Sequence, residues 1–282
     1  MSNTQNSQIK TCFITGASSG FGLAFAEYAL SRGHNVVATA RDPSTLTALV
    51  GKTPERVLAH ALDVTREGDA ARAVTAAVAH FGRIDVLINN AGYGIVGALE
   101  ETPDNELRAL METNFFGAMA VTRAALPVLR AQRGGAIVNI SSMGGQMSFA
   151  GFSAYSASKF ALEGASEALA QEVAGFGIKV VIVEPGSFRT NLLGASLRHM
   201  PVIDDYQQAV GGTRSYTRSE DGAQAGDPAK AAAAIERALR AEKTPLRLQL
   251  GADAIDAVRA HAETLLADLN AWEAVGKATQ FD

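Results

Sequence analysis

The sequence predicts an α/β fold: a doubly wound parallel sheet of about seven strands with helices on both faces, built as a single domain. Predicted strands and helices alternate along most of the chain, which is the pattern of a parallel sheet with crossover helices. The strands are nearly continuous apolar runs, as expected where both faces of a sheet are covered. No repeat or linker divides the 282 residues, so we expect one domain over residues 9–282 after a flexible N-terminus, residues 1–8.

The predicted elements follow one another in a regular order. Strands are expected at short apolar runs, and helices where apolar residues recur at three and four. Thr65 is expected to cap the second helix. Pro103 suits the first position of the third helix, which can contain a break. The strands are Thr11–Ile14, Asn35–Ala40, Val57–Leu62, Ile84–Ile88, Ala136–Ile140, Lys179–Val183 and Leu246–Leu250, and the helices run from Leu23 to about Gly33, from Thr65 to about His80, from Pro103 to about Arg130, and over Ser153–Ala174 and Pro228–Ala241.

Two segments depart from this alternation. Residues 187–226 are too many for an ordinary connection, and their apolar first half and polar second half suit either a surface loop or a lid over a site. Their position after the carboxyl end of a strand favours the lid. In residues 252–273 an apolar stripe recurs at three and four, so a helix there is expected to pack on the body or on a second subunit. The stripe consists of Ile255, Val258, Ala262, Leu265, Leu269 and Trp272.

Composition and charge exclude several classes of protein. A net charge of −4 argues against a nucleic-acid partner. No apolar stretch approaches the length of a membrane span, and the polar N-terminus has no signal core. The single cysteine, Cys12, allows no intrachain disulfide and lies in an apolar run, where a buried, inert thiol is expected. We therefore expect a cytoplasmic protein.

A glycine-rich turn, Thr15–Gly22, follows the first strand and opens the first helix. Strand, turn and helix in this order form the context of a dinucleotide site, because glycines let the backbone approach a pyrophosphate at the helix N-terminus. The spacing is Thr-Gly-x-x-x-Gly-x-Gly, and a simple tight turn is the alternative. The residues expected to contact the cofactor are Gly16, Ser18, Ser19, Gly20, Phe21 and Gly22.

The end of the second strand bears on the choice of cofactor. NAD sites commonly place an acidic residue there to bind the ribose hydroxyls, but this chain has Ala40 and then Arg41. A guanidinium can hold a 2′-phosphate with two hydrogen bonds, so we favour NADP. NAD stays possible, because a shifted loop could present Asp42 to the ribose.

Tyr155 and Lys159 lie four residues apart in a predicted helix and so share one face of it. A cation near a phenol lowers its pKa and allows proton transfer near neutral pH. A surface lysine over a half-buried tyrosine is the alternative. No metal site is expected, because the five histidines lack ligand spacing.

Several motifs together resemble the short-chain dehydrogenase/reductase family. They occur in the order and spacing of that family, from Thr11 to Thr190, and residues 155–167 are further similar to its hydroxysteroid and retinol dehydrogenase branch. The motifs are Thr15-Gly16 with Gly20 and Gly22, Asn89-Asn90-Ala91-Gly92, Asn114, Ser142, Tyr155 with Lys159, and Pro185-Gly186 with Thr190. The resemblance implies a Rossmann-like fold, hydride transfer with NAD(P), and a homo-oligomer, either a dimer or a tetramer.

The resemblance also assigns roles to individual residues. Tyr155 exchanges a proton with the substrate oxygen, Ser142 hydrogen-bonds the same oxygen, and Lys159 lowers the pKa of Tyr155 and binds the nicotinamide ribose. Asn114 holds a water that links Lys159 to solvent, while Ser141, beside Ser142, points away. The cofactor residues implied by the family are Asp63, Val64, Asn90, Ala91, Gly92, Pro185, Gly186 and Thr190. Asp63 has an alternative role, in capping the helix with Thr65.

The substrate is expected to be a lipophilic ketone or aldehyde, or the corresponding alcohol. The strand-end loops and the first half of the segment 187–226 carry many apolar residues and offer no obvious cation for a substrate phosphate, although Arg189 and Arg198 lie in the lid. The apolar loop residues are Tyr93, Ile95, Val96, Met143, Met147, Phe149 and Phe152. Alternatives are a non-catalytic NADP-binding regulator, which has no need of the Ser-Tyr-Lys set, and a nucleotide-sugar epimerase or dehydratase, which generally has a larger C-terminal domain.

Overall fold

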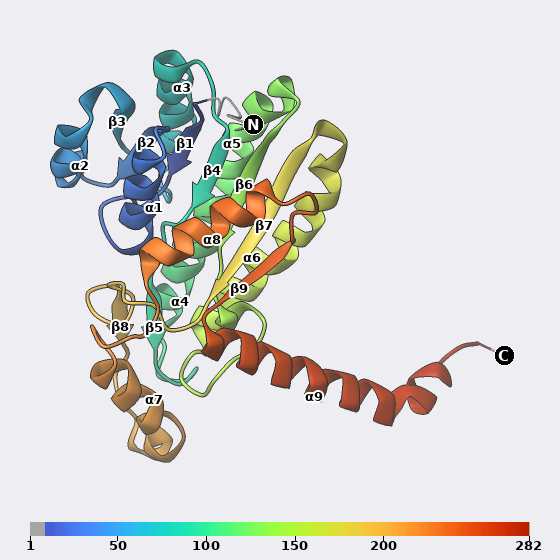
Figure 1. The fold of residues 1–282 in the computed structure, drawn as a ribbon. Helices are drawn as coiled ribbons and strands as arrows, with labels where there is room; N and C mark the ends of the chain where they lie inside the picture. The colour runs from blue at the N-terminus through green and yellow to red at the C-terminus, as the bar shows by residue number, and fades with distance from the viewer. Residues whose placement is uncertain (1–8, 282) are drawn as a thin grey trace, which may run out of the picture.

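The protein is described by a computed structural model over residues 9–281, so the predicted flexible N-terminus lies outside the described residues. Seven parallel strands form one sheet in the order β3-β2-β1-β4-β6-β7-β9 (Figure 1). The strands are β1 (Thr11–Ile14), β2 (Asn35–Ala40), β3 (Val57–Ala61), β4 (Val86–Asn89), β6 (Gly135–Ile140), β7 (Ile178–Pro185) and β9 (Arg247–Leu250). The chain winds outward in both directions from β1 and β4, which confirms the doubly wound single-domain fold.

Helices cover both faces of this sheet. One core lies between the sheet and α1 (Gly20–Ser31), α2 (Thr47–Lys52) and α8 (Pro228–Arg240). The other lies between the sheet and α3 (Asp69–Phe81), α5 (Ala118–Gln132) and α6 (Ser153–Val173). Cys12 is buried, and burial raises the pKa of its thiol to about 12, as expected of an inert core residue. Within residues 9–281 we find no helix with the length and apolar character needed to span a bilayer.

The second helix begins later than predicted, and Thr65 does not cap it. The helix α3 starts at Asp69 after Gly68, whose positive φ of 81° a glycine adopts readily. The backbone N–H and hydroxyl of Thr65 instead donate to Oδ1 of Asp63, at 3.0 and 2.7 Å. The local turn therefore competes successfully with the helix for these donors.

The third predicted helix contains the anticipated break. The helix α4 (Asp104–Met111) continues into a π-helical segment, Glu112–Gly117, before α5 begins. Pro103 precedes the first helical residue instead of occupying it. A π-helical turn widens the backbone spiral, and such turns are frequent at functional sites. Here the segment carries Asn114.

The segment 187–226 is more ordered than a surface loop. It contains a short strand, β8 (Leu197–His199), which pairs with β5 (Gly94–Val96), and a 13-residue helix, α7 (Gln207–Ser219). The sequence did not predict α2, β5, β8 or α7. Ile95 and Val96 were expected near the substrate, but their places in β5 bury them completely.

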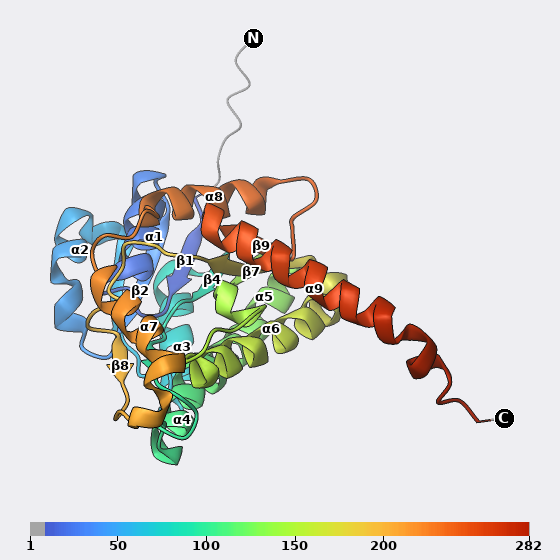
Figure 2. The ribbon, with the colours of Figure 1, turned by 90° about the horizontal axis from the view of Figure 1, so that it is seen from below.

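The last helix, α9 (Ala252–Lys277), packs on the body only through its first turns. Figures 1 and 2 show its second half extending away from the rest of the molecule. Leu265, Leu269 and Trp272 are 56–68% exposed. The expectation that the apolar stripe packs on the body is therefore wrong for this half of the helix.

Candidate active site

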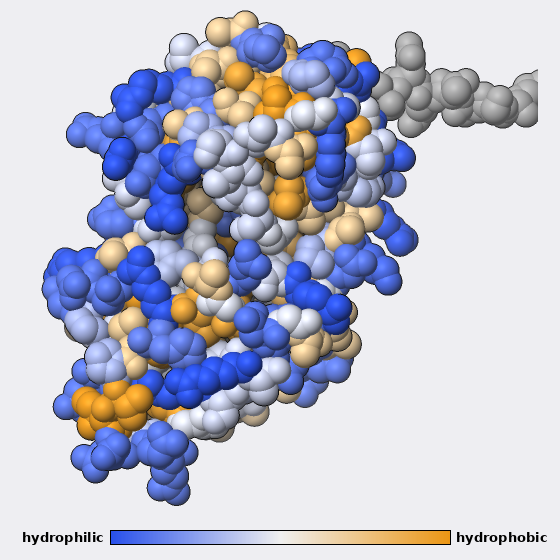
Figure 3. Space-filling view, turned by 90° about the vertical axis from the view of Figure 1, so that its left-hand side faces the viewer, coloured by the Kyte–Doolittle hydropathy of each residue, from blue (hydrophilic) through white to orange (hydrophobic). Residues whose placement is uncertain are grey.

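A large cavity of about 1230 Å³ lies at the carboxyl ends of the strands, where the winding direction reverses between β1 and β4. Open α/β sheets bind ligands at this position. The space-filling view shows a hollow in the middle of one face, with apolar side chains near it (Figure 3). The cavity is lined by most of the predicted site residues, namely Gly16, Ser18, Ser19, Gly20, Phe21, Arg41, Asp63, Val64, Asn90, Ala91, Gly92, Ser142, Tyr155, Lys159, Pro185, Gly186 and Thr190.

The glycine-rich turn has the backbone that its sequence demands. Gly16 and Gly20 have φ values of +64° and +53°, in the left-handed region that favours glycine. Gly22 does not line the cavity but is buried behind the turn. A Cβ at Gly22 would lie 2.2 Å from the carbonyl oxygen of Gly16, so this glycine permits close packing of the turn.

Thr15 and Asn90 connect the turn to the end of β4. The hydroxyl of Thr15 accepts hydrogen bonds from the backbone N–H groups of Asn90 and Ala91, both at 2.9 Å. The side-chain amide of Asn90 donates to the carbonyl oxygens of Thr15 and Gly16 at 2.9 and 3.1 Å. Four hydrogen bonds thus hold the turn against the neighbouring strand, which keeps the α1 N-terminus facing the cavity.

Arg41 and Asp63 lie at one end of the cavity, and Asp42 does not line it. Oδ1 of Asp42 instead accepts from the backbone N–H of Ser44 at 2.9 Å. Burial acts to raise the pKa of Asp63, but hydrogen bonds from Thr65 and the nearby positive charges, including Arg41, lower it overall. Arg41 is exposed, and Asp63 pairs with Arg66 at 3.7 Å. Within residues 9–281 the guanidinium of Arg41 makes no ion pair and can bind a ligand.

The helix α6 brings Tyr155 and Lys159 to the opposite wall of the cavity. Both are buried, and Nζ of Lys159 donates to the carbonyl oxygen of Ile140 at 2.8 Å. Burial lowers the pKa of Lys159 to about 8, while the charge of Glu163 acts in the other direction. The predicted low pKa of Tyr155 is not seen: burial raises it, although a hydrogen bond with Ser142 opposes the rise. Nζ lies 5.8 Å from the centre of the Tyr155 ring.

Asn114 is placed behind this wall by the π-helical segment, with 1% exposure. Its Oδ1 accepts from the N–H of Tyr93 at 3.1 Å, and its Nδ2 donates to the carbonyl oxygen of Tyr93 and to Oγ of Ser158, both at 3.0 Å. A Cβ at Gly92 would lie 3.0 Å from Oδ1 of Asn114 and 3.8 Å from Nζ of Lys159. The absence of a side chain at Gly92 leaves space between these two groups.

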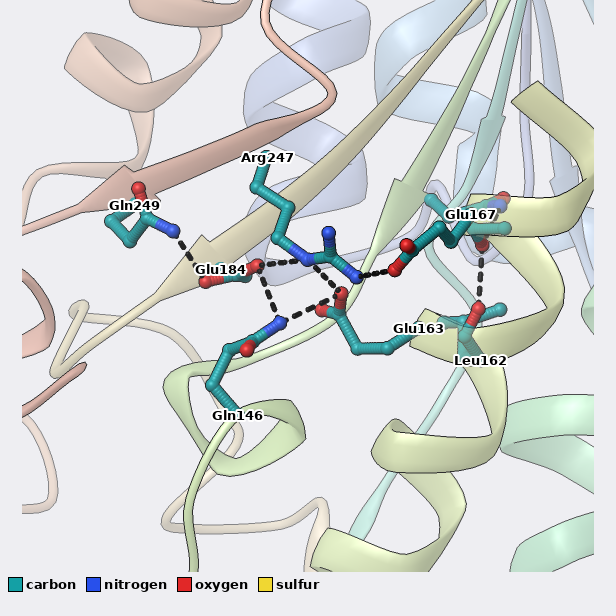
Figure 4. Close-up of polar contacts among 9 residues, drawn as sticks. Gln146, Leu162, Glu163, Glu167, Glu184, Arg247 and Gln249 are labelled. Atoms are coloured by element: carbon teal, nitrogen blue, oxygen red, sulfur yellow. Dashed lines mark hydrogen bonds and ion pairs between the residues drawn. The ribbon is translucent and has the colours of Figure 1, made fainter. Parts of the chain in front are cut away.

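Figure 4 shows a group of carboxylates, Glu163, Glu167 and Glu184, around Arg247. Glu163, one turn after Lys159 in α6, and Glu184, in β7, are 4% and 0% exposed. Nε of Arg247, from β9, lies 3.0 Å from Glu163 and 3.6 Å from Glu184, and its Nη2 lies 2.5 Å from Glu167. Burial and the charge of Glu163 raise the pKa of Glu184 to about 7. Burial raises the pKa of Glu163, and the nearby hydroxyl of Ser141 is one of the groups that oppose this rise. Ser141 also lines the cavity.

The side of the cavity away from the glycine turn is mostly apolar. Of the predicted apolar loop residues, Tyr93, Met143, Phe149 and Phe152 line the cavity, and Met147 does not. From the apolar first half of the segment 187–226, Leu192 and Leu193 line it, whereas Met200 and Ile203 do not. Phe188 also lines the cavity but packs on Phe21 of the glycine turn, with ring centres 5.2 Å apart. Arg189 does not line the cavity, because its Nε donates to the carbonyl oxygen of Gln224 at 3.2 Å. Arg198 lines it but pairs with Glu106 at 2.7 Å and lies 4.4 Å from the centre of the Tyr93 ring.

A buried ion pair holds α7 against the body. Arg214 is 4% exposed and pairs with Glu101, which also accepts hydrogen bonds from the backbone N–H groups of Ala98 and Ile203 at 2.6 and 2.8 Å. Burial acts to raise the pKa of Glu101, but these donors outweigh it and the pKa is lowered. The segment 187–226 is thus anchored beside the cavity by a charged contact.

Sequence reasoning missed the contribution of α9 to the cavity. Asp253 and Ala257, from its first turns, line the wall. Oδ2 of Asp253 accepts from the backbone N–H of Ser187 at 2.6 Å, which fixes the chain after β7. An acidic residue after Gly251 was visible in the sequence, but no local pattern connects it with a segment 66 residues away.

A parallel α/β sheet with a glycine turn and a Tyr-Lys pair at its switch point defines an oxidoreductase of the nicotinamide-dependent class. The chain matches the model of the short chain dehydrogenase family over residues 10–200, and it belongs to that family. It is 43% identical to "Oxidoreductase BOA17" of Botryotinia fuckeliana, over 96% of this chain and 99% of that one.

Two further proteins are similar to this chain. A short-chain dehydrogenase from Streptomyces avermitilis, a solved structure, is 52% identical with a TM-score of 0.92, covering 97% of this chain and 100% of its own. The "3-ketodihydrosphingosine reductase" of Bacteroides thetaiotaomicron is 48% identical over 65% of each chain. The fold and the family expected from the sequence are therefore confirmed.

Proposed function

We propose that the protein is an NADP-dependent oxidoreductase that interconverts a lipophilic ketone or aldehyde and its alcohol, with Tyr155 as general acid and base. The observation that carries this proposal is the meeting of Ser142, Tyr155 and Lys159 in one cavity wall, with the glycine turn lining the same cavity. A dinucleotide regulator needs no such group, so the enzymatic function is favoured.

The cavity suits a dinucleotide together with a substrate. Its volume of 1230 Å³ exceeds the roughly 300–1,000 Å³ of pockets for one small ligand. The N-terminus of α1, opened by glycines with positive φ, favours a pyrophosphate. Arg41 is the residue we assign to a 2′-phosphate, and Asp63 and Val64 to the adenine side. Pro185, Gly186 and Thr190 are assigned to the nicotinamide side.

The proposed chemistry divides the work between the cofactor and the chain. A bound nicotinamide supplies or accepts the hydride. Tyr155 donates a proton to the substrate oxygen in reduction and takes it back in oxidation, and Ser142 hydrogen-bonds that oxygen. With a pKa near 8, Lys159 is mostly charged at pH 7 and is the group from which Tyr155 is reprotonated. The space that Gly92 leaves beside Asn114 and Lys159 suits the water of a relay to solvent.

The apolar half of the cavity supports a lipophilic substrate. Its cation, Arg198, is already paired with Glu106, so a substrate phosphate has no free partner on this side among the lining residues. The name of the Bacteroides relative gives a ketone as its substrate, which agrees with a carbonyl substrate here. Residues 187–226 act as the lid of this half.

Replacing Tyr155 by phenylalanine tests the reaction. The variant should lose at least about 100-fold in kcat, because the proton donor is removed, while NADPH affinity stays near that of the wild type. The matched control is Tyr216→Phe, a second cavity tyrosine, whose hydroxyl lies 2.9 Å from that of Ser187. NADPH consumption with a panel of bulky ketones is the assay. A Tyr155→Phe enzyme that keeps substantial activity would show that another group moves the proton.

Replacing Arg41 by alanine tests the choice of cofactor. The loss of its guanidinium should raise the KM for NADPH about tenfold or more and leave the KM for NADH nearly unchanged. Arg66→Ala is the control, because Arg66 is exposed and pairs with Asp63 from outside the cavity. A wild-type enzyme that prefers NADH in kcat/KM would refute the assignment.

Two expectations from the sequence stay proposals. A cytoplasmic location is supported by the single, buried Cys12, which fits a reducing compartment. A homo-oligomer is supported by the apolar stripe on α9, whose geometry allows a more specific inference.

A further inference from the structure

The second half of α9 presents large apolar side chains to solvent. Leu265, Leu266, Leu269, Trp272 and Val275 are 56–68% exposed, and Figures 1 and 2 show this part of the helix projecting beyond the body. Contiguous apolar surface of this kind marks an interaction site. A single exposed helix has little to stabilise it unless its apolar face packs on a partner.

The spacing of the stripe identifies the kind of partner. From Ile255 onward the intervals are three, four, three, four and three, and the next step of four reaches Gly276. This is the a and d pattern of a heptad repeat, which pairs with another helix. The a positions are 255, 262, 269 and 276, and the d positions are 258, 265 and 272. We propose that α9 pairs antiparallel with α9 of a second copy of this chain.

The antiparallel direction follows from the position of the bodies. Each body sits at the N-terminal end of its own α9, so a parallel pair would bring two bodies to the same end, whereas an antiparallel pair puts them at opposite ends (Figure 2). In the antiparallel arrangement each a side chain meets a d side chain of the partner, and the two together fill the layer. Ala262 meets the partner's Trp272, Leu265 meets the partner's Leu269, and Gly276 meets the partner's Val258.

Charges beside the stripe complement one another in the same register. Arg259 and Glu273 occupy e positions, and antiparallel helices place e opposite e, so Arg259 meets the partner's Glu273 twice by symmetry. Within one chain these side chains make only exposed pairs, Arg259 with Asp256 at 3.2 Å and Glu273 with Lys277. Such pairs contribute little and can exchange. Asp268 falls opposite the partner's Asp268, which is a repulsive contact.

The pairing brings the partner to the edge of the cavity. Asp253 and Ala257, in the first turns of α9, line the cavity wall. In the proposed register the end of the partner's α9, near the partner's Lys277, lies alongside Ala257. Each copy therefore covers the outer side of the other's cavity wall. This surface stands independently of the reaction proposed above, because it rests on α9 alone.

Sedimentation velocity on the full chain, from about 1 to 100 µM, tests the pairing. Leu269→Glu should raise the dissociation constant at least about 100-fold and halve the assembled mass, because it puts two charges in the seam. Ala274→Glu, on the outer face of the helix, should leave assembly unchanged. A wild type that is monomeric at 100 µM, or a Leu269→Glu variant that assembles like the wild type, would overturn the proposal.

Charge exchange tests the direction and register. Arg259→Glu and Glu273→Arg should each weaken assembly about fivefold, and the double variant should restore it. Asp268→Asn should tighten assembly severalfold by removing the repulsion at the symmetry axis. A double variant that is weaker than both single variants, or an Asp268→Asn variant that assembles less well, would rule out this antiparallel register even if α9 were the contact.

Discussion

The carboxylates around Arg247, namely Glu163, Glu167 and Glu184, allow a quantitative prediction of stability for Glu184→Gln. Glutamine has nearly the same shape, so the exchange removes a buried charge without leaving a cavity. In the wild type, Oε1 and Oε2 of Glu184 accept from the amides of Gln146 and Gln249 at 3.2 and 2.7 Å. An amide flip of Gln249 can preserve the second contact, because its oxygen can then accept. Arg247 keeps Glu163 and Glu167 as partners.

The magnitude follows from the pKa of Glu184. Its ordinary value of 4.5 is raised to about 7, so between these values the folded state binds more protons than the unfolded state. Wild-type stability therefore falls as pH rises from about 4.5 to 7. Each pKa unit corresponds to about 1.4 kcal/mol, so the difference of about 2.5 between the two values sets an upper limit of about 3–4 kcal/mol. Arg247 is 30% exposed, so water screens the cluster and about 1–3 kcal/mol is expected.

Urea unfolding at pH 5 and pH 8 measures this effect. Glu184→Gln should be about 1–3 kcal/mol more stable than the wild type at pH 8, and the gain should shrink towards zero at pH 5. Glu167→Gln is the matched control, because its side chain contacts the same arginine but is 51% exposed. Its effect should stay below about 1 kcal/mol. A Glu184→Gln variant that is less stable at pH 8, or a gain that does not change with pH, would refute the reasoning.

Two other substitutions test packing around the cavity. Arg214→Met leaves the buried Glu101 without its cation, so it should lower the free energy of unfolding by about 3 kcal/mol and speed hydrogen exchange in α7. Arg218→Met, at an exposed position of the same helix, is the control. Unchanged hydrogen exchange in the Arg214→Met variant would argue against the anchor. Gly22→Ala would place a Cβ 2.2 Å from a backbone oxygen of the turn, so it should lower both Tm and NADPH affinity, the latter at least about tenfold. The control is Gly164→Ala on the exposed face of α6, where the added Cβ meets no other atom. It should instead raise the free energy of unfolding by about 0.5–1 kcal/mol. Normal NADPH binding by the Gly22→Ala variant would contradict the packing argument.

The parts of the site that depend on one local segment were predictable. The glycine turn was recognised because strand, glycines and helix are contiguous in Thr11–Ser31, and the structure has that order. Tyr155 and Lys159 share a face because a helix repeats every 3.6 residues. The same reasoning failed where a local turn competes with a helix for hydrogen-bond donors. The hydroxyl of Thr65 donates to Asp63 instead of capping the helix, and α3 starts four residues later, at Asp69.

The sequence by itself determined the alternation of strands and helices, because short-range spacing encodes it. It also identified the family, because the motifs occur in the order and spacing of that family, and the family in turn implied the residues that face the cavity from the strand ends. Only the tertiary structure decided what meets across the chain. Glu163, Glu184 and Arg247 come from α6, β7 and β9, and Asp253 reaches the segment after β7 from the last helix. The same folding left the apolar stripe of α9 uncovered. Such contacts depend on how distant elements pack against one another, and this packing cannot be predicted from the periodicity of a single segment.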